Sequence, residues 1–591
     1  MQELEYPFDA GSIFRHKRKL KKQLKAVLNH PKQVNIAVLG GSTTHNLVEL
    51  IELFLLQYNI EPQFYESEYN AYWQDALFGN EALDGFNPDL VYIHTSCRNI
   101  TAFPDVTFTK EQSDTLLKEQ FEYFEKMWTA LEQKFACPII QNNFDMLFYR
   151  VLGNLDAYDY RGKNHFIEKL NMLFGEYALE HKNFYINDIH YLSAYLGLAA
   201  WHDANDWHRY KYAMSVNFLP DVAANVCAII KSVYGKNKKF IACDLDNTMW
   251  GGIVGDDGVS GIEIGTETYE GQAYLEFQQY LLELKKMGIV LTVNSKNDEA
   301  NALEGLNHPS GAVKAGDFAV IKANWENKNQ NIVDIANELQ LGIDSAVFLD
   351  DNPTERAIVA ETVPGVAVPE IGTVGDYIKV IDRNAFFEPV EISADDIQRS
   401  EMYKKNAQRK KLQLEFADYG EFLNSLNMKA EICAFKEIYL PRIAQLTNKS
   451  NQFNLTTRRY TLAEIESIYR EPNALCLYGK LEDKFGDNGV VAISIGHLEE
   501  EIMVIDLWLM SCRVLKRDME KAMMDAFVAK AKAMGAKKII GIYLPTAKNA
   551  MVKNFYGEQG FTLLEESESC NKWELDVNNY KKQNTVIDVA E

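Results

Sequence analysis

The sequence predicts a multidomain α/β protein, and its length, its composition and its alternation of strands with helices lead to that prediction. A chain of 591 residues is too long for one hydrophobic core, so about three to four domains are expected. Hydrophobic residues make up 47% of the chain and aromatic residues 12%, which is typical of folded proteins and not of disordered ones. Apolar runs of strand length alternate with segments of helical periodicity, as in parallel sheets covered by helices.

The charge balance and the cysteines limit the possible classes of function. The chain has 61 basic and 84 acidic residues, and its net charge of −23 argues against general binding to nucleic acid or to anionic membranes. The start, Met1-Gln-Glu-Leu-Glu-Tyr-Pro, lacks the features of a signal peptide, and no apolar stretch approaches the roughly 20 residues of a membrane span. The eight cysteines include no CxxC pair, which fits reduced thiols better than a zinc ribbon or a disulfide framework. We therefore expect a soluble cytoplasmic protein with no nucleic-acid partner and no membrane partner.

The N-terminal region, residues 1–235, is expected to form a parallel sheet under helices. The predicted elements are a basic lead helix over 14–30, strands over 34–39, 63–65, 89–94, 138–140 and 184–186, and helices over 46–58 and 201–234. Ser42 lies in a glycine turn at the end of the first strand, which is the edge where α/β proteins form their sites.

This first block, Gly40-Gly41-Ser42 followed by a helix, resembles that of SGNH-type esterases and lipases, which read Gly-Asp-Ser. The resemblance puts Ser42 at the nucleophile position and Gly41 in place of the Asp. A serine nucleophile also needs a base, which the family takes from an Asp-x-x-His. Asp188-Ile-His190 and Asp203…His208 both have a different spacing. We therefore expect a degenerate domain that docks a partner or holds a carrier or substrate, rather than a working hydrolase.

The central region, residues 236–375, carries the most specific motif of the chain. The hydrophobic run Ile241-Ala-Cys243 ends in Asp244 and Asp246, and Thr248 follows. Because strand side chains alternate, the two carboxylates are expected to start on the same face. Two carboxylates at the end of one strand, on the same face, repel each other unless a cation lies between them or one of them holds a proton. The motif therefore suits a Mg²⁺ site with a nucleophile and an acid/base group side by side.

Two later positions in this region are candidates for binding a phosphoryl group. A strand over 289–293 closes on Ser295, whose hydroxyl can donate to a phosphoryl oxygen. Lys328 stands just before a predicted helix over 329–339, where it can bridge a carboxylate and a phosphate.

An acidic pair completes the series of motifs, and a glycine-rich loop is expected beside the carboxylates. The buried strand over 346–349 ends in Asp350 and Asp351, which suit a cation site of hard oxygen ligands. The loop over 253–261 is too rich in glycine for a helix and is expected to form a flap beside the carboxylates.

Asp-x-Asp-x-Thr, Ser, Lys and Asp-Asp, in this order, resemble the haloacid dehalogenase (HAD) phosphatase superfamily, and the surrounding residues resemble its FkbH branch in subfamily IIIC. The resemblance implies a Rossmann-like core with Asp244 as the nucleophile that forms an aspartyl phosphate. It implies that Asp246 protonates the leaving oxygen and then activates the hydrolytic water. Ser295 and Lys328 would clamp the phosphoryl oxygens.

The same resemblance implies a Mg²⁺ cofactor held by Asp244, by the backbone carbonyl of Asp246, and by Asp350 with help from Asp351. Only about 42 residues, 252–293, separate the first two motifs, and they already hold a flap and a helix. A large cap domain has no room there. Neighbouring domains are therefore expected to screen the site and to select the substrate.

The C-terminal region is expected to begin with a charged helical linker over 376–425 and to continue as an α+β domain over 426–591. Its strand and helix order and its Phe-Tyr…Gly-Phe ending resemble the GNAT acyltransferase fold. In that family a loop of the form Arg-x-x-Gly-x-Gly/Ala binds the pyrophosphate of acetyl-CoA. Here Arg513 aligns, but Lys516 and Asp518 occupy the glycine positions. A carboxylate repels a pyrophosphate, so the sequence argues against use of acetyl-CoA. Tyr556 aligns with the general acid of the acetyltransferase fold, but the same pattern is typical of a core residue.

Three hypotheses of function follow. The first is a Mg²⁺-dependent phosphatase acting on a small phosphorylated metabolite. The second comes from the resemblance to FkbH-type proteins, which implies a transfer of a glyceryl group from 1,3-bisphosphoglycerate to an acyl carrier protein. Cys512 and Cys243 are its candidate thiols, although each is also typical of a packed small residue. The third is a scaffold whose enzyme folds have decayed, and the intact phosphatase motifs argue against it.

Overall fold

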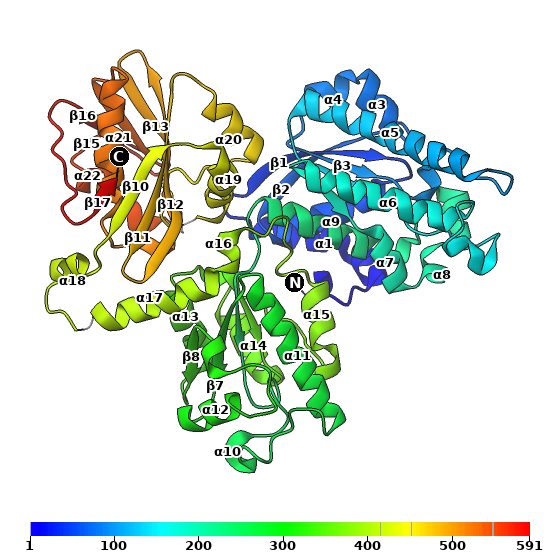
Figure 1. Cartoon of the computed structure of the whole chain (residues 1–591), viewed down its shortest axis with the longest axis horizontal. Helices are drawn as coiled ribbons and strands as arrows, with labels where there is room; N and C mark the ends of the chain where they lie inside the picture. Colours follow the sequence, from blue (N-terminus) through cyan, green and yellow to red (C-terminus); the bar gives the residue numbers. More distant parts are fainter. Residues whose placement is uncertain (1, 414, 451, 547–548, 591) are drawn as a thin grey trace. The chain divides into compact units, whose positions relative to one another are not determined.

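The computed structural model describes residues 2–413, 415–450, 452–546 and 549–590 (Figure 1). The described residues form two compact units. Unit 1 contains Met1–Val233 and Arg383–Val390, and unit 2 contains Tyr234–Asp382 and Glu391–Glu591. The return segment Arg383–Val390 falls inside the expected linker. It contacts unit 1 through the Arg383 guanidinium, which lies 3.6 Å from the carboxylate of Asp221, and through the carbonyl of Glu388, which accepts from the hydroxyl of Ser232 at 2.7 Å.

Unit 1 is built on a parallel sheet with the strand order β2-β1-β3-β4-β5. The strands are β1 (Lys32–Gly40), β2 (Ile60–Glu66), β3 (Leu90–His94), β4 (Ile139–Asn142) and β5 (Phe184–Asn187). Each coincides with a strand that the sequence predicts, so the parallel α/β architecture of this region is confirmed.

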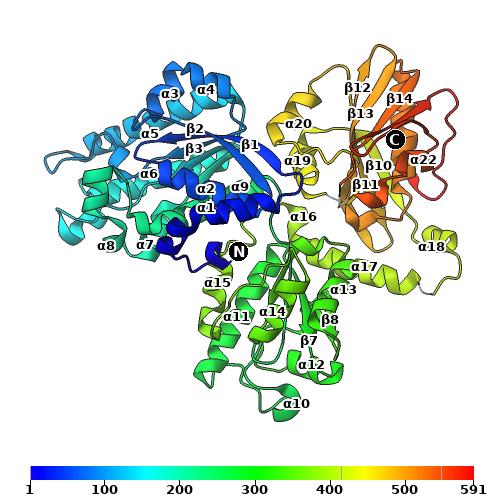
Figure 2. The ribbon, with the colours of Figure 1, turned by 180° about the vertical axis from the view of Figure 1, so that it is seen from behind.

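Helices cover both faces of this sheet (Figures 1 and 2). One layer contains α3 (Tyr72–Phe78), α5 (Lys110–Phe135) and α6 (Lys163–Glu180), and the other contains α1 (Ala10–Ala26), α2 (His45–Gln57) and α9 (Leu219–Val233). Shorter helices are α4 (Glu81–Phe86), α7 (Ile189–Leu196) and α8 (Leu198–Trp201). The stretch over 201–234 is therefore only partly α-helical, because between α8 and α9 it forms a π-helical turn over Asp206–Tyr210 and a 3₁₀-helical turn over Val216–Phe218.

One helical segment, Val216–Val233, is long and apolar enough by composition to cross a membrane, contrary to the expectation that no such stretch exists. Its mean hydropathy is 1.3, and 61% of it is buried in the structure. Because α9 in this segment packs against α2, its apolar side chains are those of a core helix.

The central domain of unit 2 has a parallel sheet with the order β8-β7-β6-β9. Its strands are β6 (Phe240–Cys243), β7 (Val290–Ser295), β8 (Val320–Ala323) and β9 (Ala346–Leu349). Its helices are α10 (Val254–Asp257), α11 (Tyr269–Lys286), α12 (Glu299–Leu306), α13 (Lys328–Leu339), α14 (Pro353–Thr362) and α15 (Tyr377–Arg383). Between β6 and β7 the structure has only the flap, with its single helical turn α10, and α11. The expected lack of a cap domain at this point is confirmed, whereas the flap contains a helical turn that the glycines did not predict.

The C-terminal domain of unit 2 follows the helices α16 (Ala394–Ile397), α17 (Arg399–Gln413) and α18 (Tyr419–Ser425). Its mixed sheet has the order β15-β16-β14-β13-β12-β11-β10-β17. The strands are β10 (Lys429–Ala434), β11 (Ala474–Asp483), β12 (Gly486–Glu499), β13 (Ile502–Met510), β14 (Lys538–Tyr543), β15 (Thr562–Glu566), β16 (Asn571–Asp576) and β17 (Asp588–Ala590). The helices are α19 (Leu440–Lys449), α20 (Leu462–Tyr469), α21 (Met519–Ala533) and α22 (Phe555–Glu558). The sequence did not predict the last three strands, of which β15 is exposed along its whole length and so lacks a buried face.

Candidate active site at the carboxyl edge of the central sheet

Strand register brings the first and last acidic motifs together. In the pairing of β6 with β9, Cys243 lies opposite Leu349, so the residues that follow them, Asp244 and Asp350, leave the sheet side by side. The amide of Asp244 donates to the carbonyl of Leu349 at 2.8 Å, which fixes this placement beyond the end of β6. Both carboxylates are buried, with Asp244 6% exposed and Asp350 fully buried.

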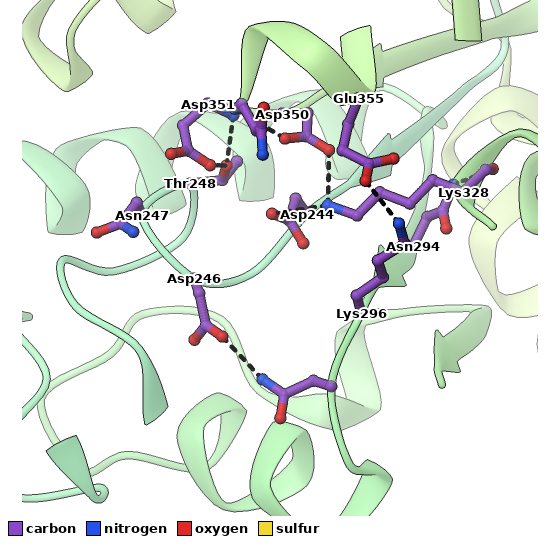
Figure 3. A network of polar contacts seen from close by, with 12 residues as sticks. Asp244, Asp246, Asn247, Thr248, Asn294, Lys296, Lys328, Asp350, Asp351 and Glu355 are labelled. Carbon is purple, nitrogen blue, oxygen red and sulfur yellow. Dashed lines mark hydrogen bonds and ion pairs between the residues drawn. The ribbon is translucent and has the colours of Figure 1, made fainter. Parts of the chain in front are cut away.

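Lys328, the first residue of α13, brings its ammonium group between these two carboxylates (Figure 3). Its Nζ lies 2.9 Å from Oδ2 of Asp244 and 2.7 Å from Oδ2 of Asp350. The lysine is only 4% exposed, so the three charges interact in a site from which bulk water is largely excluded. The sequence-based expectation that Lys328 lies beside the first motif is met by these contacts.

The acidic residues of the site repel one another, and burial strengthens this effect. Burial and then the charge of Asp244 raise the pKa of Asp350 to about 6, although Lys328 opposes the shift. The same two causes raise the pKa of Asp351. Burial alone would lower the pKa of Lys328, but the charges of Asp244 and Asp350 outweigh it and raise that pKa. The lysine therefore stays charged, and one ammonium is too little charge for this set of carboxylates.

The residues present fit a divalent cation. One carboxylate oxygen from each of Asp244, Asp350 and Asp351 lies within 4.8 Å of the others. Three carboxylates and one ammonium leave two negative charges, and carboxylate oxygens are the ligands that Mg²⁺ prefers. The backbone of this site is held by Thr248, whose hydroxyl accepts from the amide of Asp351 at 3.1 Å and lies 3.4 Å from its carboxylate.

The carboxylate of Asp246 is separate from this cluster, contrary to the expectation that it shares a face with that of Asp244. Strand β6 ends at Cys243, so the alternation of a strand no longer applies to the two aspartates. The chain turns at once, with the amides of Thr248 and Met249 donating to the carbonyl of Leu245. As a result Asp246 is turned away from Lys328, as Figure 3 shows.

Three donors hold the carboxylate of Asp246 in its own position. Its Oδ1 accepts from the indole Nε1 of Trp250 at 3.0 Å and from the amide of Val254 at 3.0 Å. Its Oδ2 accepts from Nδ2 of Asn297 at 2.9 Å. Burial raises the pKa of Asp246, although the hydrogen bonds from Val254 and Trp250 lower it in part. The sequence showed Trp250 and Asn297 beside the motifs but gave no signal that their side chains meet Asp246.

Ser295 lies where the sequence placed it, at the carboxyl end of β7, and it is 1% exposed. It takes no part in the contacts among Lys328, Asp244 and Asp350. Its neighbour Lys296 forms an ion pair with Glu355 of α14 at 2.6 Å. The structure therefore places Ser295 at the same edge of the sheet as Asp244, because β7 pairs with β6 and Asp244 directly follows β6.

Arg356 is a further residue of this site that sequence reasoning missed. Its Nη1 donates to the backbone carbonyls of both Asp350 and Asp351 at 2.8 Å, and its Nη2 lies 2.6 Å from Glu370. The side chain is 7% exposed. It therefore fixes the backbone of the acidic pair. Its place in the sequence, six residues after Asp350 and within α14, gave no sign of this contact.

Ser42 of unit 1 does not meet a base in the structure. Its side chain is 3% exposed, and within the described chain its Oγ has no hydrogen-bond partner. A Cβ atom on Gly41 would lie 2.2 Å from Nδ2 of Asn99, which donates to the carbonyl of Gly41. The side chain of Asn99 thus occupies the space that the family's Asp side chain would need.

A second cluster in unit 1 is a hydrogen-bonded part of the core. Cys97, Asp145 and His202 place one ligand-type atom each within 4.8 Å of the others. Asp145 already accepts from the amide of Cys97 and from Nε1 of Trp201, both at 2.8 Å. Burial raises the pKa of the Cys97 thiol well above its ordinary value, so it stays protonated. These contacts occupy the carboxylate and identify the cluster as structural.

In the C-terminal domain, the loop that aligns with the pyrophosphate loop of acetyltransferases has backbone conformations typical of glycine at positions that hold other residues. Lys516 and Asp518 both have a left-handed backbone, with φ of +61° and +60°, a conformation that favours glycine. Tyr556 is 1% exposed among hydrophobic side chains, and Gly541 packs against its ring. Tyr556 is therefore a core residue in this structure and not an exposed general acid.

The two candidate thiols differ in what the structure describes. Cys243 is fully buried in β6, and burial followed by the charge of Asp244 raises the pKa of its thiol. It is a packed residue and not a nucleophile. The side chain of Cys512 lies outside the described part of the structure.

Comparisons with known proteins point to one family. The profile described as "FkbH, N-terminal domain" matches residues 35–231. A crystal structure of the N-terminal part of the protein BF1531 from Bacteroides fragilis, containing a phosphatase domain complexed with Mg, is 30% identical to this chain. The match covers 64% of this chain and 99% of that one, with a TM-score of 0.59.

Smaller matches come from solved acetyltransferases. The ribosomal-protein-S18-alanine N-acetyltransferase of Escherichia coli is 11% identical over 25% of this chain and 94% of its own, with a TM-score of 0.20. Ard1 from Thermoplasma volcanium is 19% identical over 25% of this chain and 97% of its own, also with a TM-score of 0.20. Among curated proteins, none matches the chain.

Proposed function

Because the chain belongs to the FkbH-like family of proteins with a HAD-type phosphatase domain, we propose that it is a Mg²⁺-dependent phosphohydrolase acting on a small phosphorylated metabolite. The observation that carries this proposal is the buried contact of Lys328 with Asp244 and Asp350. A lysine held between a nucleophilic carboxylate and a carboxylate of a cation site is suited to receive a phosphoryl group.

In the first step, an oxygen of Asp244 attacks the phosphorus atom and the bond between phosphorus and the ester oxygen breaks. Asp246 gives its proton to the leaving oxygen, which departs as an alcohol. Lys328 and the hydroxyl of Ser295 bind the phosphoryl oxygens. The product of this step is an aspartyl phosphate on Asp244 and an ionised Asp246.

In the second step, Asp246 takes a proton from a water molecule as that water attacks the phosphorus atom. The bond between phosphorus and Asp244 breaks, orthophosphate leaves, and both carboxylates return to their starting states. The raised pKa of Asp246 suits a group that must hold a proton in one step and accept one in the next.

The cation would be held by Asp244, Asp350 and Asp351, whose oxygens lie within 4.8 Å of one another. When bound, Mg²⁺ supplies positive charge that reduces the repulsion between the phosphoryl oxygens and the nucleophile. The Mg in the Bacteroides fragilis structure supports this choice of cation.

Release of phosphate from a panel of phosphorylated metabolites, with Mg²⁺ and with EDTA, tests the proposal. We expect release from at least one compound, dependent on Mg²⁺. Absence of Mg²⁺-dependent release from every compound in the panel, with the chain shown to be folded, would contradict the proposal and favour the scaffold hypothesis.

Transfer of a glyceryl group to an acyl carrier protein is the second candidate, supported by the family match over residues 35–231. It needs an acyl-accepting thiol, and Cys243 is too deeply buried to serve. Intact mass of holo carrier proteins incubated with the chain, Mg²⁺ and 1,3-bisphosphoglycerate separates the two candidates. A carrier that gains the mass of a glyceryl group supports the transferase, whereas free phosphate without any gain in carrier mass supports the phosphatase.

We also infer that the C-terminal domain has an acyltransferase-like fold without a working cofactor loop. The parallel pair β13 and β14, connected through α21, supports the fold. Lys516 and Asp518 in glycine-like conformations support the loss of pyrophosphate binding, because each adds a side chain, one of them a carboxylate, at a position where the resembled loop has a glycine. Absence of acetyl-CoA binding by calorimetry is the expected result.

A further inference from the structure

We propose that Asn297 and Trp250 are positioning residues that hold the carboxylate of Asp246 for its two proton transfers. This inference rests on the proposed phosphatase function and deepens it. Both side chains lie in the stretches around the phosphatase motifs that resemble the FkbH branch, but that resemblance gave neither of them a role. In the proposed reaction neither is needed to touch the phosphoryl group.

The described residues place a set of donors around this one carboxylate. Asn297 donates to Oδ2 of Asp246 at 2.9 Å, while Trp250 and the amide of Val254 donate to Oδ1 at 3.0 Å each. Because both oxygens are held, from two different segments of the chain, the carboxylate is restrained against rotation. Oδ1 already accepts two hydrogen bonds and Oδ2 accepts one, so Oδ2 keeps the capacity to carry the transferred proton.

The two donors are themselves held in place. Trp250 is 1% exposed, and its ring lies so close to α12 that a Cβ atom on Gly305 would be 2.8 Å from the ring carbons. Asn297 is 5% exposed and stands between the end of β7 and the start of α12. The segment after β7 therefore supplies Asn297 directly and fixes Trp250 through Gly305.

The contacts of Asn297 and Trp250 keep the carboxylate of Asp246 away from Lys328. The ionised carboxylate of Asp246 is attracted to the ammonium of Lys328, which already contacts Asp244 and Asp350. An acid/base group drawn into that cluster would lose its approach to the leaving oxygen. Neutral donors such as an amide and an indole keep the carboxylate apart from the cluster without adding a charge of their own. They hold it in both of its protonation states.

The test compares two phosphate esters that differ in their need for an acid. Departure of phenol from phenyl phosphate is assisted by a proton, whereas 4-nitrophenol leaves from p-nitrophenyl phosphate as a stable anion. The ratio kcat/KM reports only the steps up to phosphorylation of Asp244, so it isolates the role of Asp246 as an acid. For Asn297→Ala we expect kcat/KM for phenyl phosphate to fall roughly tenfold more than for p-nitrophenyl phosphate.

Trp250→Phe is the second variant, and Trp325→Phe is its matched control. Both remove an indole N–H that donates to an aspartate, but the partner of Trp325 is Asp298, which takes no part in the reaction. Trp325 is 71% exposed. We expect Trp250→Phe to show the same dependence on the leaving group as Asn297→Ala, and Trp325→Phe to match the wild type with both esters.

The outcomes distinguish the inference from the function on which it rests. A wild type that hydrolyses the esters while both folded variants lose activity equally on the two, or lose none, overturns the positioning role and leaves the phosphatase standing. A folded wild type that releases no phosphate with Mg²⁺ from either ester or from any compound of the metabolite panel overturns the proposed function, and the inference with it. A selective loss on phenyl phosphate, with the Mg²⁺ requirement unchanged, supports both.

Discussion

The ammonium group of Lys328 lies 2.9 Å from the carboxylate of Asp244, and both side chains are buried. A buried ion pair of this kind is costly to separate, because the remaining charge has no water to stabilise it. The same lysine contacts Asp350 at 2.7 Å, so it balances part of the charge of the site before any cation binds. The contact joins residues that are far apart in the sequence and defines the chemistry of the central domain.

Asp244→Asn is expected to abolish phosphate release. The amide retains the shape of the carboxylate but is a poor nucleophile, so kcat should fall roughly 10⁴-fold or more. Phosphate release on the best compound of the panel, with circular dichroism as a control for folding, measures the effect. A folded variant with undiminished activity would show that another group attacks the phosphorus atom.

Lys328→Met is expected to make the stability of the central domain depend strongly on Mg²⁺. The change leaves Asp244 and Asp350 without their ammonium partner, and the free energy of unfolding in EDTA should fall by about 3 kcal/mol. Added Mg²⁺ should restore part of the loss, because it supplies the missing positive charge. Thermal unfolding with EDTA and with Mg²⁺ checks this prediction, and an equal loss of stability in both conditions would contradict it.

Asp350→Asn is expected to raise the Mg²⁺ concentration needed for half-maximal activity by roughly tenfold or more. Asp351→Asn should have the smaller effect, because Asp351 is half-buried whereas Asp350 is fully buried next to Asp244. Asp334→Asn, on α13 outside the site, is a matched control of the same chemical change. A titration of activity with Mg²⁺ ranks the three variants, and the reverse order for Asp350 and Asp351 would reassign the main ligand.

His94→Gln is expected to weaken the dependence of unit 1 stability on pH. Burial lowers the pKa of His94 from 6.5 to about 4. Between these two pH values the unfolded chain therefore binds a proton at His94 and the folded chain does not. The stability from neutral His94 is therefore present above pH 6.5 and is lost as the pH falls toward 4. Between pH 7 and pH 5 the wild type should lose about 2 kcal/mol more than the variant.

Native-state hydrogen exchange of the β3 amides at the two pH values measures this difference in unit 1 directly. Identical losses in wild type and variant would show that His94 already binds a proton in the folded state.

Gly41→Asp, which restores the residue of the esterase motif, is expected to destabilise unit 1 without creating esterase activity. Its Cβ would lie 2.2 Å from Asn99 Nδ2, and relieving this overlap should cost about 1–3 kcal/mol. Gly41→Ala should be destabilised as well, whereas Gly85→Ala, which has no atom within 4 Å of the new Cβ, should not be. Chemical unfolding and hydrolysis of a short-chain ester test the series. A stable, ester-cleaving Gly41→Asp would show that unit 1 retains a hydrolase site.

Much of the phosphatase site was predictable because its signals are local. A hydrophobic run that ends in Asp244, and another that ends in Asp350, identify two buried strands and the edge at which their carboxylates emerge. Parallel strands of one sheet share that edge, so the meeting of the two residues follows from the fold class. Lys328 was predictable only as a candidate, because an isolated lysine carries no local sign of its partners.

Residues whose role depends on three-dimensional neighbours were missed or misread. Trp250 and Asn297 lie in the stretches that resemble the FkbH branch, but nothing local showed that both side chains donate to Asp246. The shared face expected for Asp244 and Asp246 was wrong because strand alternation stops where β6 ends, at Cys243. Strand β15 was not predicted, because all of its residues are exposed and its sequence therefore lacks the alternation of hydrophobic and polar residues that marks a half-buried strand.

The fold class of the chain, the strands of its parallel sheets and the acidic and basic residues available for chemistry could all be read from the amino-acid sequence, since each depends on hydrophobic periodicity and residue type within short segments. Which of the charges meet became clear only from the folded chain. Contacts between segments distant in the chain bring Lys328 to Asp244 instead of leaving it in water. Contacts of the same kind hold the carboxylate of Asp246 apart from the cation cluster. Packing sets those contacts, and no local pattern encodes the distance between two side chains.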